Sequence, residues 1–223
     1  MASTREQLFS AIEEGDADAA RALLAADPSL ATERDGEGVS TLMRAVYRGD
    51  ASMVEALRAG RPELDVFEAA ALGDVGRLSE LLSDDPSIAD ARSPDGFTVL
   101  HLAAFFGESE AVRLLIARGA EVDPRGSGWM TGTPLHSAAA SGHTDIGILL
   151  LDAGADPDAR QSGGWTPLHS AAQNRDASLV EELLQRGADP AAINDDGRSV
   201  RDLAEDGGDP DVIARIEEAL VRR

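Results

Sequence analysis

Histidines are the residues of this chain best suited to acid–base or metal chemistry, and three of the four recur in one setting. His101, His136 and His169 each follow a leucine, as in Thr133-Pro134-Leu135-His136, and are spaced almost evenly along the chain. That wide spacing places them on separate helices, and packed helices lie about 8–10 Å apart. Zinc requires every ligand nitrogen at about 2.0–2.1 Å. The pattern therefore favours structural histidines and predicts no metal site.

Other candidates for catalysis are also weak. Serine follows histidine in His136-Ser137, but neighbours along a helix do not face each other. A serine and a histidine of adjacent segments could still meet, yet nothing supplies an obvious oxyanion site. The glycine-rich stretches 126–128 and 162–164 lack the preceding strand and the longer motif that phosphate binding requires. The sequence predicts no catalytic residue, no enzyme activity and no cofactor.

Composition excludes further classes of function. The chain has no cysteine, and all of its 20 basic residues are arginine, so disulfides, thiolate metal sites and a Schiff-base lysine are excluded. With 41 acidic residues the net charge is −21, which repels phosphate backbones and anionic membranes. Apolar runs stay well below the roughly 20 residues of a membrane span, and the first residues lack a signal-peptide core. We expect a cytoplasmic protein without a nucleic-acid or membrane partner.

The histidine-containing stretch belongs to an internal repeat. Aligning its leucine, and the glycine seven positions later, gives seven units whose steps are nearly equal, with one exception. A Thr-Pro pair suits the first turn of a helix, and paired alanines allow a second helix to approach closely. A Gly-Ala pair then ends the second helix. The anchors in chain order are Leu8, Leu42, Val66, Leu100, Leu135, Leu168 and Arg201.

The Thr-Pro-Leu-His motif and the repeat period of about 33 residues resemble the ankyrin repeat family over nearly the whole chain. The resemblance implies an all-α ankyrin-repeat solenoid, in which each unit has two antiparallel helices and a short β-hairpin-like finger. It also implies that the signature histidine bonds backbone groups and ties neighbouring units together. We expect a single domain, residues 1–223, with approximate units 4–34, 35–61, 62–92, 93–123, 124–159, 160–192 and 193–223.

One step of the repeat is too short. The second and third anchors, Leu42 and Val66, lie much closer together than any other neighbouring pair, so the third unit should lack a finger. A tight, continuous stack is the favoured interpretation, and a hinge near residues 60–62 is the alternative. The finger before Thr133 is instead two residues longer than the one before Thr166.

The aromatic residues mark the candidate binding surface. Of eight aromatics, Phe9 and Phe67 stand at the histidine position and are interpreted as core residues. The other six stand at positions that the repeat leaves free. Phe97 and Trp165 precede the signature threonine on fingers, and we expect their side chains to project to the concave side. The remaining four are Tyr47, Phe105, Phe106 and Trp129.

Partners of ankyrin repeats usually bind at finger and first-helix positions, so the resemblance implies a non-enzymatic module that binds a protein in a concave groove. The predicted lining is Tyr47, Arg48, Leu72, Phe97, Phe105, Phe106, Trp129, Met130 and Trp165. In the alternative, Phe97, Phe105 and Phe106 line a pocket for an apolar small molecule, with His101 or His136 as acid or base. Packing of Phe105 or Phe106 between units, folding of Trp129 over its own finger, and a self-assembling role also remain open.

Overall fold

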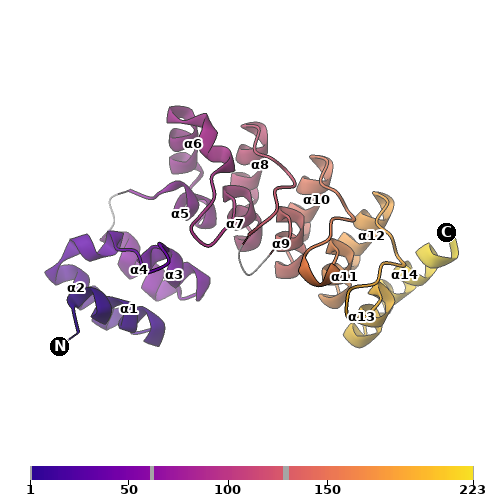
Figure 1. The fold of residues 1–223 in the computed structure, drawn as a ribbon, viewed down its shortest axis with the longest axis horizontal. Helices are drawn as coiled ribbons and strands as arrows, with labels where there is room; N and C mark the ends of the chain where they lie inside the picture. Colours follow the sequence, from indigo (N-terminus) through magenta and orange to yellow (C-terminus); the bar gives the residue numbers. More distant parts are fainter. Residues whose placement is uncertain (1, 61–62, 128–130, 223) are drawn as a thin grey trace.

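The computed structural model describes residues 2–60, 63–127 and 131–222, and this part of the chain is a row of helix pairs. Figure 1 shows the pairs side by side, with the two termini at opposite ends. The longest described helix has 13 residues, and no described helix is long and apolar enough to cross a membrane. The α-helices are α1 Thr4–Glu14, α2 Ala17–Ala26, α3 Thr41–Tyr47, α4 Ala51–Ala59, α5 Val66–Ala71, α6 Val75–Asp84, α7 Val99–Phe106, α8 Ser109–Ala117, α9 Pro134–Ser141, α10 Thr144–Asp152, α11 Pro167–Gln173, α12 Ala177–Gln185, α13 Val200–Gly207 and α14 Pro210–Arg222.

Local sequence sets the ends of the first helix in each pair. A Ser, Thr or Asp stands at each N-cap, as Ser40 does for α3, where its hydroxyl accepts from the backbone N–H of Met43. Pro134 opens α9, where its fixed φ fits the first turn. Gly107 ends α7 with a φ of 85°, a left-handed conformation that favours glycine. The predicted helix pairs are confirmed.

Short fingers precede the first helices. Isolated antiparallel bridges join Arg34 to Ser40, Arg92 to Thr98 and Ile193 to Ser199, each across six residues. Two short 3₁₀ turns, Pro28–Thr32 and Pro86–Asp90, lie beside the helices, and a third, Ser162–Gly164, lies in the finger before α11. The hairpin-like fingers expected from the sequence are therefore present.

One apolar core runs through the whole stack. Its buried residues extend from Leu8 in α1 to Ile216 in α14. The repeated alanine pairs, such as Ala103 and Ala104, are fully buried between first helices. Because each pair covers only the faces of its neighbours, stability depends on the contacts between adjacent units.

Two of the three signature histidines tie these units together, as the resemblance implies, whereas the third, His169, bonds Thr166 of its own helix and its buried Nε2 has no hydrogen-bond partner among the described residues. His101 Nδ1 accepts a hydrogen bond from the Thr98 hydroxyl at 2.8 Å, and its Nε2 donates to the Gly132 carbonyl of the next unit at 3.0 Å. His136 bonds Thr133 in the same way and reaches the Trp165 carbonyl at 3.2 Å. Each of these two rings therefore caps its own helix and anchors the next finger.

Arginines form a second set of ties that the sequence analysis missed. Arg92 Nη1 donates to the Arg125 carbonyl of the following unit at 2.7 Å, and Arg125 in turn donates to the Arg160 carbonyl. Arg160 then reaches the Ile193 carbonyl at 3.1 Å. Their common place at the base of a finger was a usable signal. A guanidinium suits this role because its fork offers several donors in a fixed geometry.

The third unit, which lacks a finger, is joined to the second by different contacts. The Ser40 hydroxyl donates to Glu68 Oε1 at 2.6 Å, and Glu68 is fully buried. Arg34 pairs with Asp65 at 2.7 Å, although the other finger arginines bond carbonyl groups. In the third unit, carboxylates therefore accept the hydrogen bonds that carbonyl groups of a finger accept elsewhere, because this unit has no finger to supply those carbonyls.

Glu68 also corrects the interpretation of Phe67. Glu68 is the third residue of α5 and accepts from the backbone N–H of the N-cap, Asp65, at 3.0 Å. His101 holds the equivalent place in α7. Phe67 is only half-buried, and so is Phe9. Alignment on the helix-ending glycine misled here by one position, because Gly73 lies eight residues after the N-cap Asp65, whereas Gly107 lies nine residues after Thr98.

The direction of the stack changes at this junction. In Figure 1 the first two helix pairs lie across the direction that α6, α8 and α10 follow. Residues 61 and 62, at the centre of the predicted hinge, lie outside the described residues. Arg58 of α4 pairs with Asp74 at the start of α6 at 2.8 Å, so polar contacts also join the second helices across the junction.

Histidine burial makes stability depend on pH. Burial lowers the pKa values of His101 and His136 to about 4, against 6.5 for an ordinary histidine. Between pH 6.5 and 4 the unfolded chain binds more protons, so the free energy of unfolding should fall as the pH falls through this window, by up to about 3 kcal/mol per histidine. Above pH 6.5 the contribution is fully present.

Urea unfolding across this window, compared between the wild type and His101→Gln, measures the effect. Burial raises the pKa values of Glu108 and Asp123, which act in the opposite sense, so the informative quantity is the difference between the two proteins. His143→Gln, at a half-exposed position, is the matched control. Equal pH slopes for wild type and His101→Gln would contradict the assignment.

Removal of the buried carboxylate should destabilise the junction. Glu68→Ala leaves the Ser40 hydroxyl and the Asp65 N–H without this acceptor, and we expect the free energy of unfolding to fall by about 2–4 kcal/mol. Chemical denaturation followed by circular dichroism tests this. Glu80→Ala, at an exposed position on α6, should change the same quantity by less than about 0.5 kcal/mol. A loss no larger than the control's would show that Glu68 carries no such role.

Candidate partner-binding surface

Three aromatic side chains form a continuous strip between the second and fourth units. The ring centroids of Tyr47 and Phe106 are 5.8 Å apart, and those of Phe105 and Phe106 are 5.1 Å apart with an edge-on angle of 82°. These separations are typical of favourable aromatic pairs. All three side chains are half-buried. Together with the half-buried Leu72 they are called the aromatic strip below.

The short third unit brings the strip together. Tyr47 ends α3 and Phe106 ends α7, and between these helices lies α5, which has only six residues. Ala71 at the end of α5 is buried and small, so Tyr47 reaches across the third unit to Phe106. Leu72 occupies the same place in the third unit that the aromatics occupy in its neighbours.

A hydrogen bond fixes the orientation of Tyr47. Its hydroxyl donates to Asp95 Oδ2 at 2.5 Å, on the tip of the finger before α7. Burial raises the pKa of Tyr47, and the hydrogen bond and negative charge of Asp95 raise it further. Tyr47 is therefore a neutral donor at physiological pH. The sequence analysis missed Asp95, although its place in a Pro-Asp-Gly turn puts it on a fingertip.

A hollow of about 590 Å³ opens at the N-terminal end of the strip. Its wall joins first-helix positions, among them Glu13 and Arg48, to the fingertip of residues 35–37. Arg44 holds that fingertip through ion pairs with Asp35 and, at 2.8 Å, with Glu37. Deeper in the wall the Arg5 guanidinium lies 5.2 Å from the centre of the Phe9 ring, a cation–π contact.

Phe97 is not a groove residue, contrary to the sequence-based prediction. Its side chain is 4% exposed and belongs to a second apolar cluster with Val39 and Met43 of the second unit. Because the third unit has no finger, the second and fourth fingers approach one another, and Gly38 lies against Pro94. Phe97 fills the space between them instead of projecting into the groove.

The other predicted lining residues divide between two places. Tyr47, Leu72, Phe105 and Phe106 form the strip, and the exposed Arg48 lines the adjoining hollow. Trp165 is half-buried two units further along, where its ring lies 5.8 Å from that of His169. Trp129 and Met130 lie outside the described residues, as does the centre of their longer finger.

The proposed pocket for an apolar small molecule finds no room. A cavity lined by Phe97, His101 and Phe105 measures only about 10 Å³, which is enough for about one water molecule. Both ring nitrogens of His101 are already hydrogen-bonded. The aromatic residues of the fourth unit therefore contribute a surface and a core cluster.

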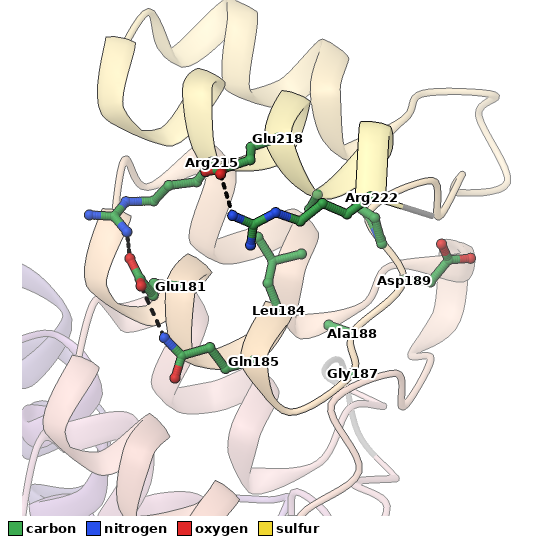
Figure 2. A pocket seen from close by; sticks show the side chains of 11 residues that line it. Glu181, Leu184, Gln185, Gly187, Ala188, Asp189, Arg215, Glu218 and Arg222 are labelled. Carbon is green, nitrogen blue, oxygen red and sulfur yellow. Dashed lines mark hydrogen bonds and ion pairs between the residues drawn. The ribbon is translucent and has the colours of Figure 1, made fainter.

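A larger hollow, of about 660 Å³, lies at the opposite end of the stack. Figure 2 shows it between the end of α12 and the last turns of α14, with Leu184 and Ala188 on its floor. The two arginines at its edge, Arg215 and Arg222, are paired with glutamates on α12 and α14. It is remote from the aromatic strip and is not part of the candidate surface.

Comparison with known proteins agrees with this architecture. A family model of ankyrin repeats in three copies matches residues 66–161 and 130–196. A probable E3 ubiquitin-protein ligase of Oryza sativa subsp. japonica is 45% identical over 62 residues, which is 27% of this chain and 14% of that protein. A putative ankyrin repeat protein of fowlpox virus is 34% identical over 128 residues, or 53% of this chain and 31% of that protein. The human DNA-binding protein RFXANK is 32% identical over 95 residues, or 43% of this chain and 36% of that protein.

These relatives share repeats with this chain, which spans between 14% and 36% of their length. Ankyrin repeats generally serve as protein–protein interaction modules and are typically not enzymes. The family match covers more than half of the chain, and helix pairs with short fingers occupy the same residues. This chain belongs to the ankyrin repeat family.

Proposed function

We propose that this protein is a non-enzymatic binding module that holds a segment of a partner protein on the aromatic strip and the adjoining hollow. The observation that carries the proposal is the unbroken contact from Tyr47 through Phe106 to Phe105 on partly exposed first-helix ends. Aromatic and arginine side chains dominate the binding energy of many interfaces, and a central apolar cluster with a polar rim is their usual arrangement.

The histidines support binding rather than catalysis. His101 and His136 bond neighbouring backbone and hydroxyl groups through both ring nitrogens. Burial lowers their pKa values to about 4, so they are weak bases at neutral pH. A general base works best with a pKa near the working pH and within reach of its substrate.

The activities named for two relatives do not carry over in this proposal. The similarity to the ubiquitin ligase covers 14% of that protein and consists of repeat sequence. The human relative is a DNA-binding protein, but a net charge of −21 opposes direct contact between this chain and a phosphate backbone. The proposed partner is therefore a protein.

Truncation of one strip residue should weaken partner binding without unfolding the protein. Phe106 packs against the second apolar cluster, so Phe105→Ala is the better variant. We expect the dissociation constant to rise at least about tenfold, or about 1.4 kcal/mol, because the side chain supplies apolar contact area. Partners captured with wild type and variant in parallel would be purified and titrated by calorimetry.

Val221→Ala is the matched control, because Val221 is 87% exposed on the last helix and far from the strip. Circular dichroism should show both variants folded. If every purified partner binds Phe105→Ala and Val221→Ala equally well, the strip is not the binding surface.

A further inference from the structure

The charges around the aromatic strip identify the chemistry of its partner. Resting on the function proposed above, we infer that the bound segment is basic: a stretch of polypeptide in which lysine or arginine alternates with apolar side chains. The inference combines the apolar floor with an excess of carboxylates on the fingertips and on the ends of the first helices.

The fingertips carry more carboxylates than arginines. The described tips of residues 35–38, 94–96, 161–164 and 195–197 hold five acidic residues and no basic one. Arg44 neutralises part of the first tip, through Asp35 and Glu37. Asp195 and Asp196 on the last tip are exposed. Three of these four tips therefore carry acidic residues.

The C-terminal ends of the first helices add further negative charge. The two residues before the helix-ending turn are Glu13 and Glu14 in the first unit, and both are exposed. Arg48 is the one arginine at these positions among the described residues. Asp206 holds the equivalent place in the last unit, where Arg198 of the preceding finger pairs with it. The apolar strip is thus flanked by exposed glutamates on the side of the first unit.

These two sets of charges border one surface. The hollow of about 590 Å³ is lined by Glu13 from the first unit, by Tyr47 from the strip and by the tip of residues 35–37. The Tyr47–Asp95 hydrogen bond likewise joins the strip to a tip. A segment lying on the aromatic rings therefore meets carboxylates within the reach of a lysine or arginine side chain.

A basic segment fits both features at once. Its apolar side chains cover Leu72 and the aromatic rings, while its cationic groups pair with tip carboxylates or lie over exposed ring faces. The chain shows this contact internally, where Arg5 lies over Phe9. An acidic segment, or a second copy of this chain with its charge of −21, would meet repulsion of like sign.

Matched synthetic peptides test the inference. Three sets would share the same leucine and phenylalanine positions, with the intervening positions all lysine or arginine, all glutamine, or all glutamate. Fluorescence anisotropy at low and high salt would measure binding to wild type, to Phe105→Ala and to two neutralised proteins. The first is Glu13→Gln with Glu14→Gln at the exposed end of α1, where Glu13 lines the hollow beside the strip, and the second, its control, is Glu55→Gln with Glu80→Gln on the second helices.

We expect the basic set to bind at least about tenfold more tightly than the glutamate set and to weaken with salt. Neutralising Glu13 and Glu14 should weaken basic peptides by about three- to tenfold, and the control should leave binding unchanged. If glutamine or glutamate peptides bind as tightly as basic ones and Phe105→Ala still weakens them, the inference of a basic partner is wrong, but the aromatic strip remains the binding surface. Binding indifferent to both Phe105 and this glutamate pair would overturn both the basic partner and the aromatic strip as its binding surface. A mass that rises with concentration, and falls in Phe105→Ala, would assign the strip to a second copy.

Discussion

The stack depends on hydrogen bonds that cross from each unit to the next. A helix pair buries one face against its neighbour, and the fingers bring backbone carbonyls to that interface, where each needs a donor. His101 supplies one donor to Gly132, and Arg92 supplies another to Arg125. Because these donors come from side chains fixed at their own helix or finger, each tie sets the spacing of two units. Register along the array follows from these ties as much as from apolar packing.

The third unit shows what happens when a finger is lost. Glu68 takes the helix-capping place that histidine holds elsewhere and accepts the hydroxyl of Ser40 from the preceding unit. The fingers on either side close on each other and bury Phe97. The same shortening draws Tyr47 onto Phe106. The candidate binding surface is therefore a consequence of the interruption in the repeat, and the regular units act as its supports.

The regular and irregular parts of the repeat have different physical roles. Buried residues that recur, such as His136 and the alanine pairs, satisfy backbone groups and permit close packing, so they have little freedom to contact a partner. Residues at positions that the repeat pattern does not fix, such as the exposed Arg48, are under fewer such constraints. Side chains at these positions can change without loss of the fold, so one repeat architecture can bind many unrelated partners.

The sequence by itself determined the helix pairs and the place of the missing finger, and its resemblance to ankyrin repeats implied the fingers and the tying role that His101 and His136 fulfil. These features depend on local rules: caps, left-handed glycines, helical spacing and a fixed period. Only the tertiary structure decided that Phe97 is buried, that Glu68 substitutes for a histidine, and that Tyr47 bonds Asp95, 48 residues away. Each depends on the distance between the second and fourth units across the short third unit. Packing along the whole stack sets that distance, and no single unit encodes it.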